Sequence, residues 1–193
     1  MNFFRKNYKE KTDEELMSFL TRHEHAAFDE LYARYSKPML NFFHRMLNFD
    51  REKAEDMLHD LFLKIIEKPQ LFDPSKSFST WLYTVAANIL KNEYRSRQTR
   101  EEYRNHRILI QENYTAPNEQ VDANIFRELL DTELDKLDLE LKTMFTMRFM
   151  EDMTLRQIAE IFDCPEGTVK SRLFYMTKNL SAKLAAFKPE NRK

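Results

Sequence analysis

Glycine is nearly absent from this chain, since Gly167 is the only one among 193 residues. Hairpin turns and phosphate-binding loops use residues that tolerate a positive φ, and glycine is the usual one. A Rossmann or P-loop nucleotide site needs several glycines near the phosphate, so the composition excludes both kinds of site. The shortage also argues against a fold rich in sheets, because sheet strands are commonly joined by such turns.

Cysteine is equally scarce, because Cys164 is the only one in the chain. A single cysteine excludes an internal disulfide and a cysteine-rich zinc site. Residues 1–11 are charged and lack the apolar run of a signal peptide. No segment approaches the ~20 apolar residues that are needed to span a bilayer. We therefore expect a cytoplasmic protein that carries no metal or other cofactor.

An excess of charge of one sign is also missing, because 31 basic and 32 acidic side chains give a formal net charge of −1. The charges are nevertheless unevenly distributed. Two basic stretches comprise Lys91, Arg95, Arg97, Arg100, Arg104 and Arg107, and then Lys170, Arg172, Lys178, Lys183, Lys188, Arg192 and Lys193. An acidic stretch between them contains Glu112, Glu119, Asp122, Glu128, Asp131, Glu133, Asp135, Asp138 and Glu140. This order suggests two contacts with one polyanion, although ordinary solvated helix faces would give the same charge runs.

Helical periodicity is what the sequence does contain, with apolar residues spaced by three and four along most of its length. The pattern predicts an all-α protein. Helices are expected just after Asp13, from about His25 to Leu47, from an N-cap at Asp50 to about Glu67, from a cap at Ser77 or Ser79, and again from about Ala123. Pro38 should kink or divide the second of these helices.

Two interruptions of this periodicity indicate how the chain is organised. Pro69 and Pro74 bracket a loop that ends at Ser77, because two prolines so close together do not fit the interior of a regular helix. A later segment contains turn residues and no apolar period, so we interpret it as a flexible linker. The predicted organisation is a helical domain at 1–105, the linker at 106–122, a second small helical domain at 123–187 and a basic tail at 188–193.

The sharpest local pattern runs from Thr154 to Leu173. Thr154 and Gln157 fit a capping box, after which Leu155, Ile158, Ala159 and Phe162 form one buried face. This helix should end at Asp163 and Cys164, and Pro165 should be the first residue of the next. The second helix should bury Val169, Leu173, Met176, Leu180 and Leu184 and expose Glu166, Thr168, Lys170, Ser171, Phe174, Tyr175 and Lys178. Such a helix-turn-helix suits the major groove of DNA, but a helical hairpin used only for packing would share its periodicity.

Three segments become informative as an ordered set. Residues 54–64 read Ala-Glu-Asp-Met-Leu-His-Asp-Leu-Phe-Leu-Lys, residues 78–88 read Phe-Ser-Thr-Trp-Leu-Tyr-Thr-Val-Ala-Ala-Asn, and residues 166–173 read Glu-Gly-Thr-Val-Lys-Ser-Arg-Leu. They resemble, in this order, region 2.2, regions 2.3 to 2.4 and region 4 of the small extracytoplasmic-function (ECF) type sigma factors of the bacterial sigma-70 family. The resemblance covers roughly residues 26–187.

This resemblance implies a sigma factor with no catalytic activity of its own, which directs core RNA polymerase to promoters and helps to melt the −10 element. The implied partners are the core polymerase, through its β′ clamp helices and β flap, duplex promoter DNA and the −10 non-template single strand. The loop from Pro69 to Ser77 would hold a base flipped out of that strand, at a cost of a few kcal/mol for unstacking that contacts in the pocket must offset. An inhibitory anti-sigma factor is a further partner that the family resemblance allows.

The resemblance also implies three sets of site residues. Polymerase contacts are expected from Glu55, Asp56, His59, Asp60, Phe62 and Leu63. Contacts with the −10 element are expected from Phe72, Ser77, Phe78, Trp81, Tyr83, Asn88, Lys91, Arg95 and Arg97. Contacts with the −35 element are expected from Glu166, Thr168, Lys170, Ser171, Arg172, Phe174, Tyr175 and Lys178. For Phe78 and Trp81, the residues themselves favour a place in the hydrophobic core over direct contact with DNA.

Some positions depart from the family pattern. Asp138 stands where proline is usual, and Asp163 replaces a common glycine, which Asp tolerates because it visits the left-handed region more readily than most residues. Ala87, Tyr175 and Thr177 stand where arginine is frequent. Fewer arginines mean fewer phosphate contacts, so promoter binding without polymerase should be weak.

Two other functions stay open from the residues alone. Glu55, Asp56, His59 and Asp60, with His23, His25 and His44, could form the metal site of a helical phosphohydrolase, although a plain acidic helix surface has the same composition. Bound metal together with phosphatase activity would identify such an enzyme. A one-component regulator would instead join the helix-turn-helix to a sensor domain. Dimerisation on palindromic DNA would favour that regulator, because a sigma factor should read two unlike elements as a monomer.

Overall fold

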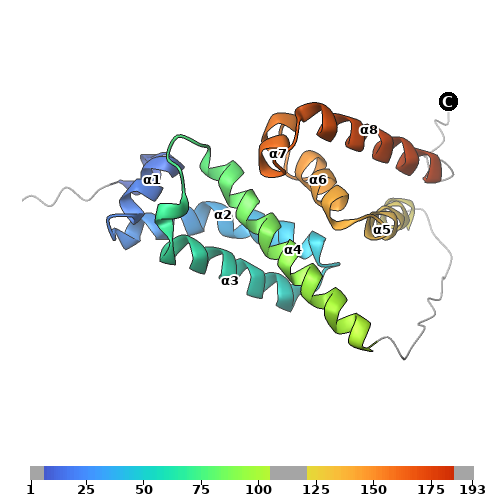
Figure 1. Ribbon diagram of the computed structural model, residues 1–193, viewed down its shortest axis with the longest axis horizontal. Helices are drawn as coiled ribbons and strands as arrows, with labels where there is room; N and C mark the ends of the chain where they lie inside the picture. The colour runs from blue at the N-terminus through green and yellow to red at the C-terminus, as the bar shows by residue number, and fades with distance from the viewer. Residues whose placement is uncertain (1–6, 105–120, 185–193) are drawn as a thin grey trace, which may run out of the picture.

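A computed structural model describes residues 7–104 and 121–184 of the chain, and every regular element within those ranges is a helix (Figure 1). The first half contains η1 (Tyr8–Glu10), α1 (Asp13–Leu20), α2 (His25–Met46), α3 (Arg51–Glu67), η2 (Pro69–Leu71) and α4 (Phe78–Arg104). The second half contains α5 (Val121–Asp135), α6 (Leu139–Phe149), α7 (Leu155–Ile161) and α8 (Glu166–Lys183). The prediction of an all-α fold is confirmed.

Most helices begin at a side-chain cap that the local sequence supplies. Asp50 accepts a hydrogen bond from the Lys53 backbone N–H at 3.2 Å, as the predicted N-cap of α3 should. Thr154 and Gln157 form the predicted capping box of α7. Pro38 lies inside the single continuous helix α2, so the expectation that it could divide this helix is wrong.

The turn between α7 and α8 differs by one residue from its prediction. Pro165 is the N-cap of α8 and has an extended ψ of 142°, so the first helical residue is Glu166. Asp163 adopts the left-handed conformation with φ of 47°, as its place in a glycine-like position suggested. The tight turn thus forms without glycine.

In the described part of the chain, the residues with a left-handed backbone conformation are all residues other than glycine. Positive φ values occur at His23, Asn48, Phe49, Asp152 and Asp163. Gly167 instead lies in α8, where an added Cβ would meet open space. Each such non-glycine residue costs roughly 1–2 kcal/mol, which the surrounding contacts must offset. Between α2 and α3, Phe49 N–H donates to the His44 carbonyl at 2.8 Å and its ring packs against His44.

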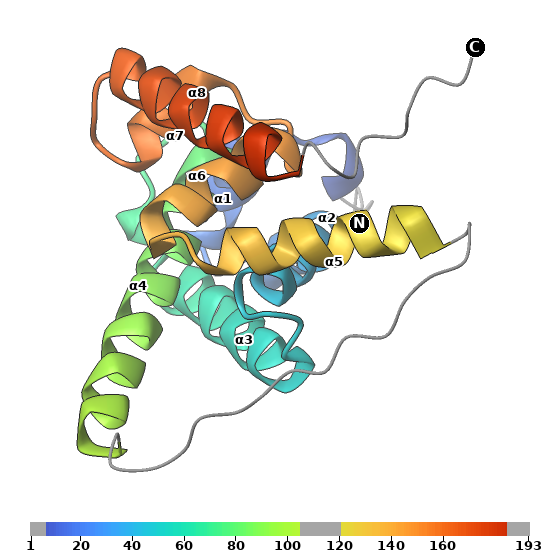
Figure 2. The same cartoon turned by 90° about the vertical axis from the view of Figure 1, so that its right-hand side faces the viewer.

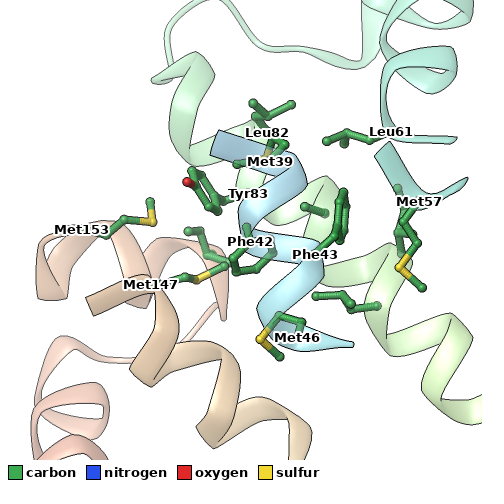
Figure 3. Packing of buried hydrophobic residues seen from close by; sticks show 14 of the residues in the cluster. Met39, Phe42, Phe43, Met46, Met57, Leu61, Leu82, Tyr83, Met147 and Met153 are labelled. Carbon is green, nitrogen blue, oxygen red and sulfur yellow. The ribbon is translucent and has the colours of Figure 1, made fainter. Parts of the chain in front are cut away.

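Helix α2 lies at the centre of the first half, where α1 and α3 pack along it and α4 crosses α3 (Figure 1). Successive residues of α2 serve different neighbours, since Phe43 points toward Met57 of α3 while Phe42 points toward the second half of the chain (Figure 3). Both phenylalanines are fully buried. Burial of one such side chain contributes roughly 1.5–3 kcal/mol.

The two halves pack directly against each other, because α6 contacts α2 and α4, and α7 contacts α4. Figure 2 shows α6, α7 and α8 on one side of the α2 and α4 pair. Phe42 and Tyr83 of the first half meet Met147 and Met153 of the second half, and all four are buried (Figure 3). An apolar contact therefore joins the halves.

A carboxylate between α6 and α7 adds a polar link across this contact. Glu151 accepts a hydrogen bond from the Tyr83 hydroxyl at 2.8 Å and a charged one from Arg45 at 2.7 Å. Burial raises the pKa of Glu151 above its ordinary value, although both donors oppose that change. Burial beside Glu151 also raises the pKa of the Tyr83 hydroxyl. Both oxygens of the carboxylate are thus committed to the other half of the chain.

A lysine makes the second polar link. Lys142 of α6 is buried, and its ammonium donates to Asn48 at 2.8 Å and to Asp135 at 2.7 Å. A longer bond of 3.5 Å reaches the Met46 carbonyl at the end of α2. Lys142 therefore fastens the start of α6 to the turn after α2.

Replacing Glu151 by Ala should loosen the packing between the halves. The change leaves the Tyr83 hydroxyl without its acceptor, and a buried donor left unpaired costs about 1–3 kcal/mol. Small-angle X-ray scattering should then report a larger radius of gyration. Glu160→Ala is the matched control, because Glu160 is exposed and pairs with Arg156 of its own helix. Equal radii for the two variants would contradict the role of Glu151.

Candidate nucleic-acid and polymerase interfaces

Helix α8 separates a buried face from an exposed polar one, as predicted. The residues expected to be buried, Val169, Leu173, Met176, Leu180 and the following Leu184, are all buried. Of those expected outside, Thr168 is half-buried, and Glu166, Lys170, Ser171, Phe174, Tyr175 and Lys178 are exposed. Ser171 uses its hydroxyl to donate to the Thr168 carbonyl at 3.0 Å. The first half of α8 thus presents short polar side chains and Lys170 along an open ridge.

Arg172 is held differently from its neighbours on α8. Its guanidinium pairs with the carboxylate of Glu140, near the start of α6. Asp138 is the N-cap of α6, where it accepts a hydrogen bond from the Leu141 N–H at 2.8 Å. Asp138, which stands where the family usually has proline, therefore supplies a cap there. Any DNA contact by Arg172 would compete with its pair to Glu140.

The loop before α4 is short, polar and locally braced. The Asp73 carboxylate accepts from both the backbone N–H and the hydroxyl of Ser75, at 2.9 and 2.7 Å. These bonds hold the pKa of Asp73 below its ordinary value. Residues 73–77 are all exposed, including Ser77, which also caps α4 by accepting from the Thr80 N–H at 3.4 Å. The loop therefore presents a defined conformation to solvent.

Aromatic rings gather where this loop enters α4. Phe72 and Phe78 are buried, whereas Trp81 is half-buried. The Trp81 ring lies 5.4 Å from that of Phe72 and 5.9 Å from that of Phe78 between centroids. Phe72 and Phe78 thus form the packing beneath Trp81, and only Trp81 of the three offers part of its ring to the surface.

The remaining residues predicted at the −10 surface divide by exposure. Asn88, Lys91 and Arg95 are exposed along α4. Tyr83 is only 6% exposed and is covered by the second half, where its hydroxyl meets Glu151. The side chain of Arg97, the linker residues 106–120 and the tail 188–193 lie outside the described part of the chain.

Helix α3 presents the acidic surface that was predicted to meet the polymerase. Glu55, Asp56, His59, Asp60 and Leu63 are exposed. Phe62 is buried instead, with its ring 5.9 Å from Phe28 and 4.7 Å from Tyr32. Asp56 and Asp60 border an open hollow of about 530 Å³ between α3 and α4. Phe62 thus supports this surface from beneath.

No set of three or more His, Cys, Asp or Glu side chains in the described residues is arranged to hold a metal ion. On the exposed face of α3, Glu55 pairs with Arg51 at 2.8 Å. Within residues 7–104 and 121–184, no helix is both long and apolar enough to cross a bilayer.

Sequence reasoning missed two features that depend on distant residues. One is an open groove of about 790 Å³ between α5, α6 and α8, whose lining includes Leu137, Leu141 and Tyr175. The other is the pair formed by Glu151 and Tyr83 across the halves. Their residues look like ordinary surface or core positions in the sequence, and no local pattern pairs them.

Comparison with known proteins agrees with this geometry. The family model for sigma-70 region 2 matches residues 31–100, and the model for sigma-70 region 4 matches residues 127–174. The ECF RNA polymerase sigma-E factor of Haemophilus influenzae is 32% identical over 185 residues, which cover 90% of this chain and 95% of that protein. The RNA polymerase sigma-H factor of Pseudomonas aeruginosa is 26% identical over 176 residues, which cover 86% of this chain and 90% of that protein.

A solved structure shows the same fold. It is the sigma factor RpoE in complex with the anti-sigma factor NepR from Bartonella quintana, with a TM-score of 0.63 at 20% identity. The match covers 82% of this chain and 96% of that one. Sigma factors as a class are not enzymes. The models for sigma-70 regions 2 and 4 both match this all-α chain, and the chain is similar to the Haemophilus sigma-E factor over 95% of that protein. It therefore belongs to the sigma-70 family, as an ECF-type sigma factor that directs RNA polymerase to promoters.

Proposed function

We propose a division of labour among three surfaces of this sigma factor. The ridge of α8 reads the −35 element, the loop before α4 together with α4 captures and helps to melt the −10 element, and α3 holds the core polymerase. The observation that carries the proposal is the exposed ridge of α8 around Lys170, which is set on a buried apolar face. The proposal places the protein in the cytoplasm and gives it no catalytic activity.

Recognition at the −35 element rests on the first half of α8. The beginning of a recognition helix approaches base edges in the major groove. Lys170 and Ser171 are exposed there and can form hydrogen bonds to base edges or phosphates. Phe174 and Tyr175 follow on the same helix, with ring centroids 5.5 Å apart. Both rings offer apolar contact, and Tyr175 does so at a position where the family frequently has a phosphate-binding arginine.

The residues that contact the −10 element in this proposal are those whose side chains are exposed or partly exposed. Ser77 lies in the exposed loop, Trp81 offers a partly open ring, and Asn88, Lys91 and Arg95 extend along α4. An aromatic side chain that stacks on an unpaired base contributes roughly 1–3 kcal/mol. Phe72 and Phe78 support that ring from the core, so we assign them a packing role rather than direct contact.

Polymerase binding uses the acidic residues of α3, which would meet a basic surface on the clamp helices of β′. Charge complementarity of this kind speeds encounter and suppresses wrong partners. The groove between α5, α6 and α8 offers an apolar surface for the second polymerase contact, at the β flap. An anti-sigma partner is part of the proposal, since the Bartonella neighbour is bound to one.

The packed arrangement of the two halves must open before both promoter elements are bound. The −10 and −35 elements lie apart along one duplex, whereas α7 packs on α4 in this structure. Contact between Tyr83 and Glu151 also covers part of α4. We propose that polymerase binding supplies the surfaces that replace this packing.

Purified protein mixed with bacterial core polymerase should produce new promoter-directed transcripts on genomic DNA. The transcripts should require both components and should share two separated sequence elements upstream of their starts. Unchanged transcript profiles at saturating protein would contradict the proposal.

Replacing Lys170 by Ala should lower initiation from such promoters by about tenfold, because one good contact to a base contributes ~1–3 kcal/mol of discrimination. Binding to core polymerase should not change. Run-off transcription and core-binding titration measure the two effects. Lys37→Ala is the control, because Lys37 is an exposed lysine of α2 that lies in none of the three proposed surfaces. A full effect of Lys37→Ala would remove the special role of Lys170.

Reversing the charge at Asp56 to Arg should weaken core binding by about tenfold or more, since like charges across an interface cost several kcal/mol. Binding of the separate −35 duplex should stay as it is. The control is Glu67→Arg, an equal charge change at the exposed far end of α3. Titration of labelled protein with core polymerase is the measurement, and tight binding by Asp56→Arg would exclude α3 as the docking surface.

A further inference from the structure

We propose that Glu14 of α1 is a positioning residue for capture of the −10 element, acting through the first turn of α4. The inference deepens the proposed function, because it rests on the loop before α4 being the capture loop. Glu14 lies outside the segment that matches sigma-70 region 2, which begins at residue 31. It is also absent from the three sets of site residues expected from the sequence.

The contact that carries the inference joins residues 64 positions apart. Glu14 accepts a hydrogen bond from the Phe78 backbone N–H at 3.0 Å, and the contact is partly buried. Phe78 is the first residue of α4, and the first N–H groups of a helix have no partner within it. The local cap meets only part of this need, because Ser77 accepts from Thr80 at a long 3.4 Å. Glu14 thus completes the cap of α4 from another helix.

Helix α1 is firmly held where it presents this carboxylate. Thr12 and Glu15 cap it by a complete capping box, and its residues Leu16, Met17 and Leu20 are buried. The preceding residue, Asp13, forms an ion pair with Arg34 at 2.7 Å and accepts the hydroxyl of Tyr35, both on α2. Figure 1 shows α1 beside the point where the loop enters α4. The carboxylate therefore has a fixed place relative to α2.

The capped residue connects directly to the capture surface. Phe78 is fully buried and packs against Tyr35, with ring centroids 5.2 Å apart. On its other sides it meets Phe72, at the start of the exposed loop, and Trp81, the half-buried ring of α4. A negative charge at the start of a helix is also favourable to the helix dipole. Glu14 consequently fixes the angle between the loop and Trp81, the two parts that must meet one unpaired base.

The test uses wild-type holoenzyme and a promoter that it selects from genomic fragments. Permanganate reactivity of the −10 region reports strand opening, while titrations report affinity for core polymerase and for the −35 duplex. Glu14→Ala should reduce opening by about tenfold, the size expected when a helix cap is lost. Affinities for core polymerase and for the −35 duplex should stay within about twofold of wild type, because Glu14 lies on α1 and its hydrogen bond reaches the first residue of α4 rather than α3 or α8.

Two further variants separate positioning from general stability. Glu14→Gln keeps an acceptor oxygen at the same place and should restore most of the opening. Glu15→Ala removes the cap of α1 itself, since Glu15 accepts from the Thr12 N–H, but leaves the contact to α4 intact. It should lower the melting temperature of the protein without lowering opening by the folded holoenzyme.

The possible failures are distinguishable. If Glu14→Ala opens the promoter as wild type does, or if Glu15→Ala lowers opening equally, the positioning role is overturned while the proposed function stands. If both affinities fall together with opening in Glu14→Ala, the residue is merely structural and the inference is again overturned. If wild-type holoenzyme itself shows no opening at the −10 region, the proposed function fails and the inference with it.

Discussion

Helix α2 carries more apolar surface than the other helices of the first half cover. The packing of the second half against the first follows from that constraint. Its Phe43 side faces α3, while Phe42 is buried only where Met147 and Tyr83 complete its surroundings (Figure 3). Removing apolar area from water favours this closure by roughly 25 cal/mol per Å². Each half would otherwise be a small domain with a modest core, for which a partner surface is a substantial source of stability.

The polar contacts between the halves work together with this apolar burial. Glu151 bonds to Tyr83 and Arg45 of the other half. Lys142 reaches Asn48 and the Met46 carbonyl of the other half and pairs with Asp135 of its own half. Paired in this way, the buried charges avoid the cost of an uncompensated charge in a low-dielectric site. Glu151 also covers Tyr83 on α4, so the packing that stabilises the free chain limits access to part of the helix proposed for the −10 element. Stability of the packed form and promoter binding therefore oppose each other.

The ends of the helices also link the structure to the proposed function. A chain with a single glycine must make its turns and caps with other residues, and it does so with Thr12, Asp50, Asp138 and Thr154 at helix starts. At α4 the cap is shared between Ser77 and the distant Glu14. Helix α4 directly follows the capture loop. The one cap among these that is shared with a distant residue therefore lies where the loop must be oriented relative to α4.

The sequence by itself determined the all-α class, most helix limits, the helix-turn-helix and the family, because caps and apolar spacing act over only a few residues. Asp50, Thr154 with Gln157, and the buried stripe of α8 are such local signals. Only the tertiary structure decided that Phe62, Phe72 and Tyr83 lie in the interior rather than at a binding surface, that Arg172 pairs with Glu140, and that Pro165 precedes α8. It also joined Glu14 to Phe78 and Arg45 to Glu151, which are 64 and 106 residues apart in the chain. Local periodicity shows that a side chain faces inward or outward on its own helix, but packing over such distances decides what covers it.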